Sequence, residues 1–79
     1  GRTVSLATVL PDQPHALVSF LEVVSSLGAN VLDVNHERRN TRAAIGSCVV
    51  NVSLETRDKA HIQEIFSSLR RKGYEVEEQ

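Results

Sequence analysis

The residues of this chain that could do chemistry lie at one turn and at the start of one later strand. Asp12 and Pro14 stand between an apolar run and an amphipathic segment, and Asn30 comes shortly after Gly28, which ends that segment. The first turn of a helix has unpaired backbone N–H groups and the positive end of the helix dipole, so it can hold a small anion such as a carboxylate. The pattern favours binding of a small ligand over catalysis.

A purely structural interpretation of the same residues stays open. Asp12 and Pro14 also suit the start of a helix, since proline has no N–H to leave unpaired at the first helical position. Asn30 can serve only to relax the chain after Gly28. In the functional interpretation, the N–H groups of the turn hold a carboxylate, while Asp12 and Asn30 fix an ammonium group or close a lid.

The three histidines are poor candidates for a metal site. They belong to different predicted elements, and no two of them have the close spacing of zinc ligands. We expect surface or helix-end positions for all three, with the second one facing inward as a partly buried imidazole. These residues are His15, His36 and His61.

The nucleophilic side chains do not form a catalytic group either. Cys48 lies among valines, which predicts a buried structural thiol. Lys59 and Lys72 are expected at exposed helix positions, and neither is a convincing Schiff-base residue. The chain by itself is therefore expected to be catalytically inert.

The composition is typical of an ordinary globular domain. The chain has 79 residues and a net charge of −1, so no basic surface is expected to recruit nucleic acid or an anionic membrane. One cysteine excludes an internal disulfide and favours a reducing, cytoplasmic setting. No apolar run approaches the roughly 20 residues that span a bilayer. Without a signal peptide or any methionine, the sequence is expected to be a piece of a longer protein.

Hydrophobic periodicity predicts a strand, a helix and a second strand in the first half of the chain. Alternation over residues 3–10 indicates the first strand, and a stripe of helical spacing runs from Pro14 to Gly28. Residues 30–38 indicate the second strand. The positions expected to face the core are Val4, Leu6, Leu10, Leu17, Phe20, Leu21, Val24, Leu27, Leu32, Val34 and His36.

The second half repeats this pattern after a polar turn. Residues 55–58 supply capping chemistry for a second helix, which Gly73 ends, and residues 74–76 indicate a short last strand. The basic residues of the preceding turn are interpreted as a solvated hairpin tip, with oligomer contacts as the second choice. The turn holds Arg38, Arg39 and Arg42, and the expected core positions are Cys48, Val50, Val52, Leu54, Ile62, Ile65, Phe66 and Leu69.

The order β-α-β-β-α-β predicts an α+β, ferredoxin-like fold, with two helices on one face of a four-stranded antiparallel sheet. The opposite face is less polar than a fully solvated one. Scattered surface apolar residues are normal, but the face could equally pack on another subunit. The apolar residues assigned to it are Ala7, Val9, Val31, Ile45 and Val49.

Two other uses of this fold class are disfavoured. Metallochaperone-type domains need paired cysteines in the first loop, and this loop has none. RNA-recognition domains stack bases on aromatic residues of the central strands. Here the two phenylalanines, Phe20 and Phe66, belong to the helix stripes.

Several segments together resemble the ACT domain, a small regulatory module that binds amino acids. The more specific likeness is to the C-terminal ACT domain of threonine dehydratases, and it covers essentially the whole chain. It rests on residues 1–2, 12–17, 28–34, 36, 38, 54–57 and 71–76. The resemblance implies one ACT domain over residues 1–79, cut from a larger enzyme.

The resemblance also implies where a ligand would bind. In this family, effectors bind between two ACT domains, near the first turn and the start of the second strand. Asp12 and Asn30 match the polar contacts, and the backbone of residues 13–17 would line the ligand carboxylate. The family usually has glycine after the proline, where this chain has His15, so the site could be altered or lost. The full expected set is Asp12, Gln13, Pro14, His15, Ala16, Leu17 and Asn30.

The function implied is amino-acid sensing combined with subunit pairing. Isoleucine or valine is the favoured effector, and the partner is a second ACT domain in a homo-oligomer. The implied parent is a pyridoxal-phosphate-dependent threonine dehydratase, which deaminates L-threonine to 2-oxobutanoate in isoleucine biosynthesis or threonine catabolism. Its cofactor would bind in a catalytic domain outside this segment. The alternative is a dimerisation module without a ligand.

Overall fold

The computed structural model describes residues 2–37 and 46–79, and it confirms the predicted element order. The basic turn residues Arg38, Arg39 and Arg42, together with Ile45, lie outside the described residues. The elements are β1 (Arg2–Pro11), α1 (Pro14–Ser26), β2 (Asn30–Glu37), β3 (Ser47–Thr56), α2 (Lys59–Arg71) and β4 (Glu75–Glu78).

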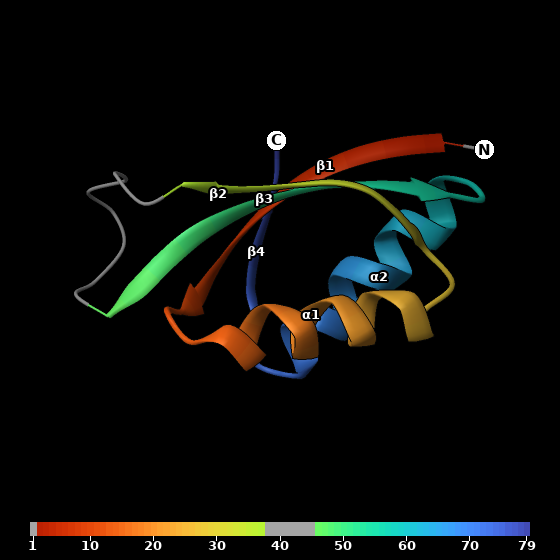
Figure 1. Ribbon diagram of the computed structural model, residues 1–79. Coiled ribbons are helices and arrows are strands. Elements are labelled where there is room, and N and C mark those ends of the chain that lie inside the picture. The colour runs from red at the N-terminus through yellow and green to blue at the C-terminus, as the bar shows by residue number, and fades with distance from the viewer. Residues whose placement is uncertain (1, 38–45) are drawn as a thin grey trace.

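The strands form one antiparallel sheet in the order β2-β3-β1-β4, with both helices on the same face (Figure 1). The central pair is long: β1 and β3 are in register from Arg2 opposite Thr56 to Pro11 opposite Ser47. Since β1 and β2 are each antiparallel to β3, they run in the same direction. The end of β1 therefore lies at the opposite end of the sheet from the start of β2.

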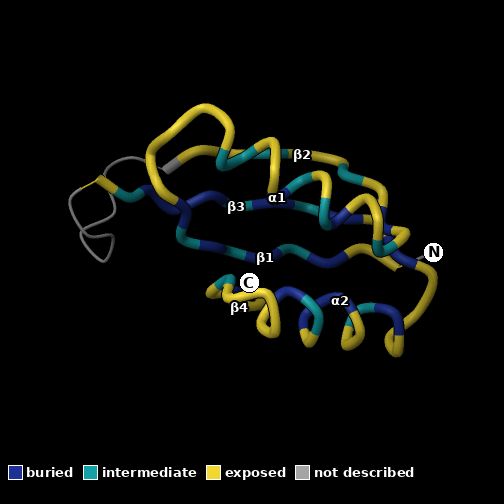
Figure 2. The backbone as a smooth tube through the Cα atoms, turned by 90° about the horizontal axis from the view of Figure 1, so that it is seen from below, coloured by how far each residue is buried: buried dark blue, intermediate teal, exposed yellow. Residues whose placement is uncertain are grey.

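The core lies between the sheet and the two helices, as the periodicity predicts. On β1, and on β3 apart from the buried Val49, buried residues alternate with more exposed ones, so one face of each strand packs on the helices (Figure 2). Each helix contributes a buried stripe to the same core. Fully buried apolar side chains include Leu6, Phe20, Val24, Val50, Val52, Leu54, Ile65 and Leu69.

The two helices begin differently. Pro14 is the first residue of α1, and Gln13 before it makes no side-chain capping bond, so Asp12 is not a helix cap. In α2, the Asp58 carboxylate accepts the backbone N–H of His61 at 2.8 Å, as the capping pattern predicts. The carboxylate of Asp12 is thus left exposed beside α1 without a structural role at the helix end.

Gly73 ends α2 in the left-handed region, with φ +96°. The Tyr74 N–H donates to the Leu69 carbonyl at 3.0 Å, and the Gly73 N–H donates to the Arg70 carbonyl at 3.0 Å. These two bonds form a Schellman ending, which needs a residue that tolerates positive φ. The ending places the Tyr74 ring edge-on against Phe20, with ring centroids 5.0 Å apart.

The predicted faces of β2 are wrong at its start. A bulge between Val31 and Asp33 shifts the alternation by one residue, so Val31 lies opposite Leu54 and packs on the core. Leu32, predicted to face inward, is 50% exposed. His36 is exposed, although its imidazole Nε2 lies 3.6 Å from the Sγ of the buried Cys48. Strict alternation cannot reveal an inserted residue in one strand.

One buried hydroxyl in the described core has no hydrogen-bond partner, and it belongs to Thr8. Because an unpaired buried polar group costs about 1–3 kcal/mol, we expect Thr8→Val to raise the free energy of unfolding by about 1 kcal/mol. Urea denaturation of both proteins measures the change. Thr56→Val is the matched control, since the Thr56 hydroxyl donates to the Arg2 carbonyl at 2.9 Å and its loss should destabilise the fold. A destabilised Thr8→Val protein would contradict the assignment.

Candidate functional site

The first turn of the chain, residues 12–17, offers few free backbone donors. The Asp12 N–H donates to the Gly46 carbonyl and the Gln13 N–H to the Pro11 carbonyl, both at 2.8 Å. Pro14 has no N–H, and the Ala16 N–H donates to the Gln13 carbonyl at 3.1 Å. Over residues 12–16, His15 alone keeps an N–H without a partner among the described residues. This turn therefore offers the carboxylate of a ligand fewer N–H donors than a helix start usually does.

The side chains of the first turn divide into two groups. Asp12, Gln13 and His15 are exposed, so the imidazole stands at the surface instead of filling an internal space. Ala16 and Leu17 are half-buried and pack against the core. Only the backbone of these two residues is therefore placed to line a ligand.

Asn30 is far from the first turn within one chain. It is the first residue of β2 and lies opposite Glu55, near the end of β3. Asp12, in contrast, is bonded to Gly46 at the start of β3. The two positions are separated by nearly the whole of β3, about 30 Å at 3.3 Å per residue from Gly46 to Glu55. Figure 1 shows the start of α1 at the left end of the sheet and the start of β2 at the right end.

A shallow hollow surrounds Asn30, and we call it the β2 hollow. It is lined by Gly28, Asn30, Glu55, Thr56 and Arg57. It brings together an amide, a carboxylate and a guanidinium group, although the capping pattern predicts only a helix start for residues 55–58. The cluster could have been predicted from the antiparallel pairing of the second and third predicted strands, because that pairing places Glu55 beside Asn30.

The two walls of the β2 hollow are joined by His61. Predicted at a surface or helix-end position, this residue does lie in the first turn of α2, but only 1% of it is exposed. The Arg57 N–H donates to Nδ1 at 3.0 Å, so the other nitrogen, Nε2, carries the proton and donates to the Leu27 carbonyl at 2.7 Å. The ring also lies under Gly28, whose absent Cβ would stand 3.5 Å from Nε2.

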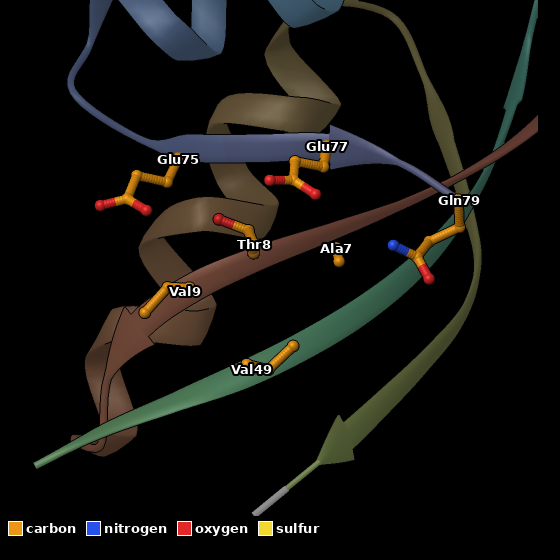
Figure 3. A pocket seen from close by; sticks show the side chains of 7 residues that line it. All are labelled: Ala7, Thr8, Val9, Val49, Glu75, Glu77 and Gln79. Atoms are coloured by element: carbon orange, nitrogen blue, oxygen red, sulfur yellow. The ribbon is translucent and has the colours of Figure 1, made fainter. Parts of the chain in front are cut away.

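A second hollow, of about 160 Å³, lies on the sheet face turned away from the helices (Figure 3). Ala7, Val9 and Val49 form its apolar floor, as expected for this face, and Glu75 and Glu77 stand at its rim. No basic side chain among the described residues lines it. An amino acid would thus find carboxylates for its ammonium group there but no cationic partner for its own carboxylate.

Metal binding and membrane insertion find no support in the described residues. Cys48 is a buried thiol, as predicted, and no group of three or more potential metal ligands occurs over residues 2–37 and 46–79. Neither of the described helices is long and apolar enough to cross a membrane.

Known proteins are similar to this chain over nearly its whole length. No family model matches the sequence. The chain is similar to L-threonine ammonia-lyase of Thermotoga maritima, with 45% identity over 76 residues that make up 96% of this chain and 19% of the relative. It is 38% identical to L-threonine ammonia-lyase of Geobacter sulfurreducens, over 98% of this chain and 19% of that relative. The chain thus spans about a fifth of the length of the curated relatives that it matches.

The fold has solved counterparts of the same extent. The ACT domain from GTP pyrophosphokinase of Chlorobium tepidum superposes with a TM-score of 0.70 at 16% identity, covering 98% of this chain and 96% of that one. The chain has the fold of an ACT domain. Its likeness to the threonine ammonia-lyases agrees with the resemblance stated from the sequence.

We expect His61→Phe to lower the free energy of unfolding of this domain by about 2–4 kcal/mol. The ring volume is kept, but the Leu27 carbonyl and the Arg57 N–H lose their buried partner. Chemical denaturation measures the loss. The matched control is His15→Phe, at an exposed position, which should change stability by less than about 0.5 kcal/mol. Equal effects at the two histidines would contradict the bridging role of His61.

Proposed function

We propose that this ACT domain is the regulatory, amino-acid-binding part of a threonine ammonia-lyase. Its similarity to two such enzymes supports the parent, and the polar residues at both ends of the sheet support the ligand class. The effector we favour is L-isoleucine or L-valine. The single observation that carries the proposal is that Asp12 and Asn30 lie at opposite ends of one chain, where each can complete a site with a second copy.

A pair formed along β2 would join these two ends. Because β1 and β2 run in the same direction, the first turn and the end of β2 share one end of the sheet, and Asn30 lies at the other. Antiparallel pairing of β2 with β2 of a second copy reverses the second copy, so Asn30 of the partner subunit comes to the end that holds Asp12. The two-fold symmetry of such a pair produces two equivalent sites.

The edges of the sheet differ in a way that favours β2 as the pairing edge. The other edge strand, β4, has the sequence Glu-Val-Glu-Glu, and antiparallel pairing with its own copy would bring carboxylates together. On β2, in contrast, the bulge turns Leu32 outward, where it is one of two large hydrophobic side chains exposed on the described surface. Burying Leu32 at the pair interface would supply part of the association energy.

Regulation by such a pair follows from linkage. An effector that contacts both chains binds the paired arrangement more tightly than any arrangement that separates Asp12 from Asn30. It therefore shifts the population of subunit arrangements by its differential affinity, and the catalytic domains attached to the two chains sense that shift.

The reaction itself belongs to the part of the parent enzyme outside this chain. We expect deamination of L-threonine to 2-oxobutanoate there, with pyridoxal phosphate supplying the electron sink. The described residues do not fit that cofactor, because Lys59 and Lys72 are exposed at the ends of α2. With Cys48 as its single cysteine, the domain suits an enzyme of the cytoplasm.

A ligand-free dimerisation module is the second candidate, favoured by the single open N–H at the first turn and by His15 in place of the usual glycine. Titration of the dimeric chain with L-isoleucine, L-valine and L-threonine, followed by amide NMR, separates the two functions. Shifts near residues 11–17 and Asn30 support sensing, with D-isoleucine as the control. The absence of any amide shift change in a sample shown to be dimeric supports the module without a ligand.

A site shared between two chains predicts complementation between two inactive variants. Asp12→Asn and Asn30→Ala should each weaken L-isoleucine binding at least tenfold while leaving the fold intact, because each removes one polar contact from both sites of the pair. Mixing the two variants should restore about a quarter of the sites with native affinity, since each mixed pair contains one intact site. Isothermal titration calorimetry counts these sites. Two variants that bind normally, or a mixture that recovers no sites, would contradict the shared site.

Pairing through β2 is tested by placing a charge at its exposed leucine. We expect Leu32→Lys to weaken self-association at least tenfold, because two lysines would meet near the two-fold axis in place of apolar side chains. Analytical ultracentrifugation measures the dimer dissociation constant. Val18→Lys is the matched control, since Val18 is 56% exposed on α1. If both variants associate like the parent chain, the interface lies elsewhere.

A further inference from the structure

The first turn leaves the carboxylate of an amino acid short of partners. Over residues 12–16, His15 alone offers an N–H that has no partner within residues 2–37 and 46–79, and the nearby Asp12 carboxylate repels another anion. A carboxylate in a protein site is commonly held by charge-assisted hydrogen bonds to both oxygens. The missing donors must therefore come from the other half of the shared site.

The β2 hollow offers such a donor. Beside Asn30 it contains Arg57, whose planar guanidinium can bind both oxygens of a carboxylate, and Glu55, which can accept from an ammonium group. Glu55 is the cross-strand neighbour of Asn30, so its side chain and the amide lie side by side. Groups of both charges around one amide match the two charges of an α-amino acid.

Resting on the proposed function, we propose that Arg57 binds the α-carboxylate of the amino-acid effector, and that Glu55 faces its ammonium group. Asn30 lies between them, and Asp12 of the partner subunit closes the site from the opposite side. The β2 hollow thus supplies a guanidinium group for the ligand carboxylate, which the residues expected from the sequence do not provide.

The side chain of Arg57 is available for this role, while its backbone is fixed. The guanidinium makes an ion pair with Glu64 at 3.9 Å, with the two side chains 73% and 59% exposed. A pair this long and this exposed is weak and can be exchanged for a ligand carboxylate. The backbone N–H of Arg57, in contrast, donates to the buried ring of His61. The backbone of Arg57 therefore stays in place when its guanidinium group reorients.

The test removes one charge from the protein and the matching charge from the ligand. Calorimetry or amide NMR titration of the dimeric 79-residue chain compares L-isoleucine with L-isoleucinamide, which lacks the carboxylate, and with N-acetyl-L-isoleucine, which lacks the ammonium group. We expect Arg57→Gln to weaken L-isoleucine binding about tenfold or more and to leave isoleucinamide binding unchanged. Glu55→Gln should weaken L-isoleucine binding and leave N-acetyl-L-isoleucine binding unchanged.

Two further variants sharpen this test. Arg71→Gln makes the same change of charge at an exposed position of the last turn of α2 and should bind L-isoleucine like the parent chain. Glu64→Gln releases Arg57 from its ion pair and should tighten binding about two- to fourfold. Arg57→Lys, which keeps the charge but loses the planar fork, should fall between the parent chain and Arg57→Gln.

The outcomes separate the failure of this inference from the failure of the proposed function. A dimeric parent chain that binds no amino acid overturns the proposed function and the role of Arg57 with it. A parent chain that binds L-isoleucine, together with an Arg57→Gln variant that binds it equally well, overturns the role of Arg57 alone. An equal loss for L-isoleucine and isoleucinamide also overturns it, because the lost contact would then not involve the carboxylate.

Discussion

The antiparallel pairing of β1 with β3 is the constraint on which the other features of this domain depend. Ten residues of each strand are in register, and this central pair places the core side chains of both strands toward the helices. The pairing also fixes direction: with β3 between them, β1 and β2 must run the same way. The first turn and Asn30 are consequently held at opposite ends of the sheet, and a site that uses both needs two chains.

The buried side chain of His61 is the second constraint on the fold, because it connects the end of one helix to the start of the other. Its buried ring joins the end of α1 at Leu27 to the turn before α2 at Arg57. Gly28, which follows Leu27, and Arg57 both line the β2 hollow, so the same hydrogen bonds that stabilise the fold also connect the backbone on its two sides. A neutral ring with one donor and one acceptor satisfies both neighbours at once.

Much of the fold follows from the sequence because its signals are local. Alternation in β1 and β3, the stripes of the two helices, the Asp58 cap and the Gly73 ending each involve residues within a few positions of one another, and the structure confirms them. The inward assignment of Leu32 is wrong because the bulge changes pairing between strands, which no local pattern records. The burial of His61 was missed since its second backbone partner, the Leu27 carbonyl, is distant in sequence and is brought to the ring only by tertiary packing.

The sequence by itself determined the order of the elements, the residues of the core and the likeness to ACT domains, because periodicity, capping and short motifs are written along the chain. Only the tertiary structure decided how the polar residues are distributed. It separated Asp12 from Asn30, paired most backbone N–H groups of the first turn, and gathered Glu55 and Arg57 around Asn30. The physical reason is that strand direction and cross-strand register place residues distant in sequence side by side, and neither is specified by any one segment.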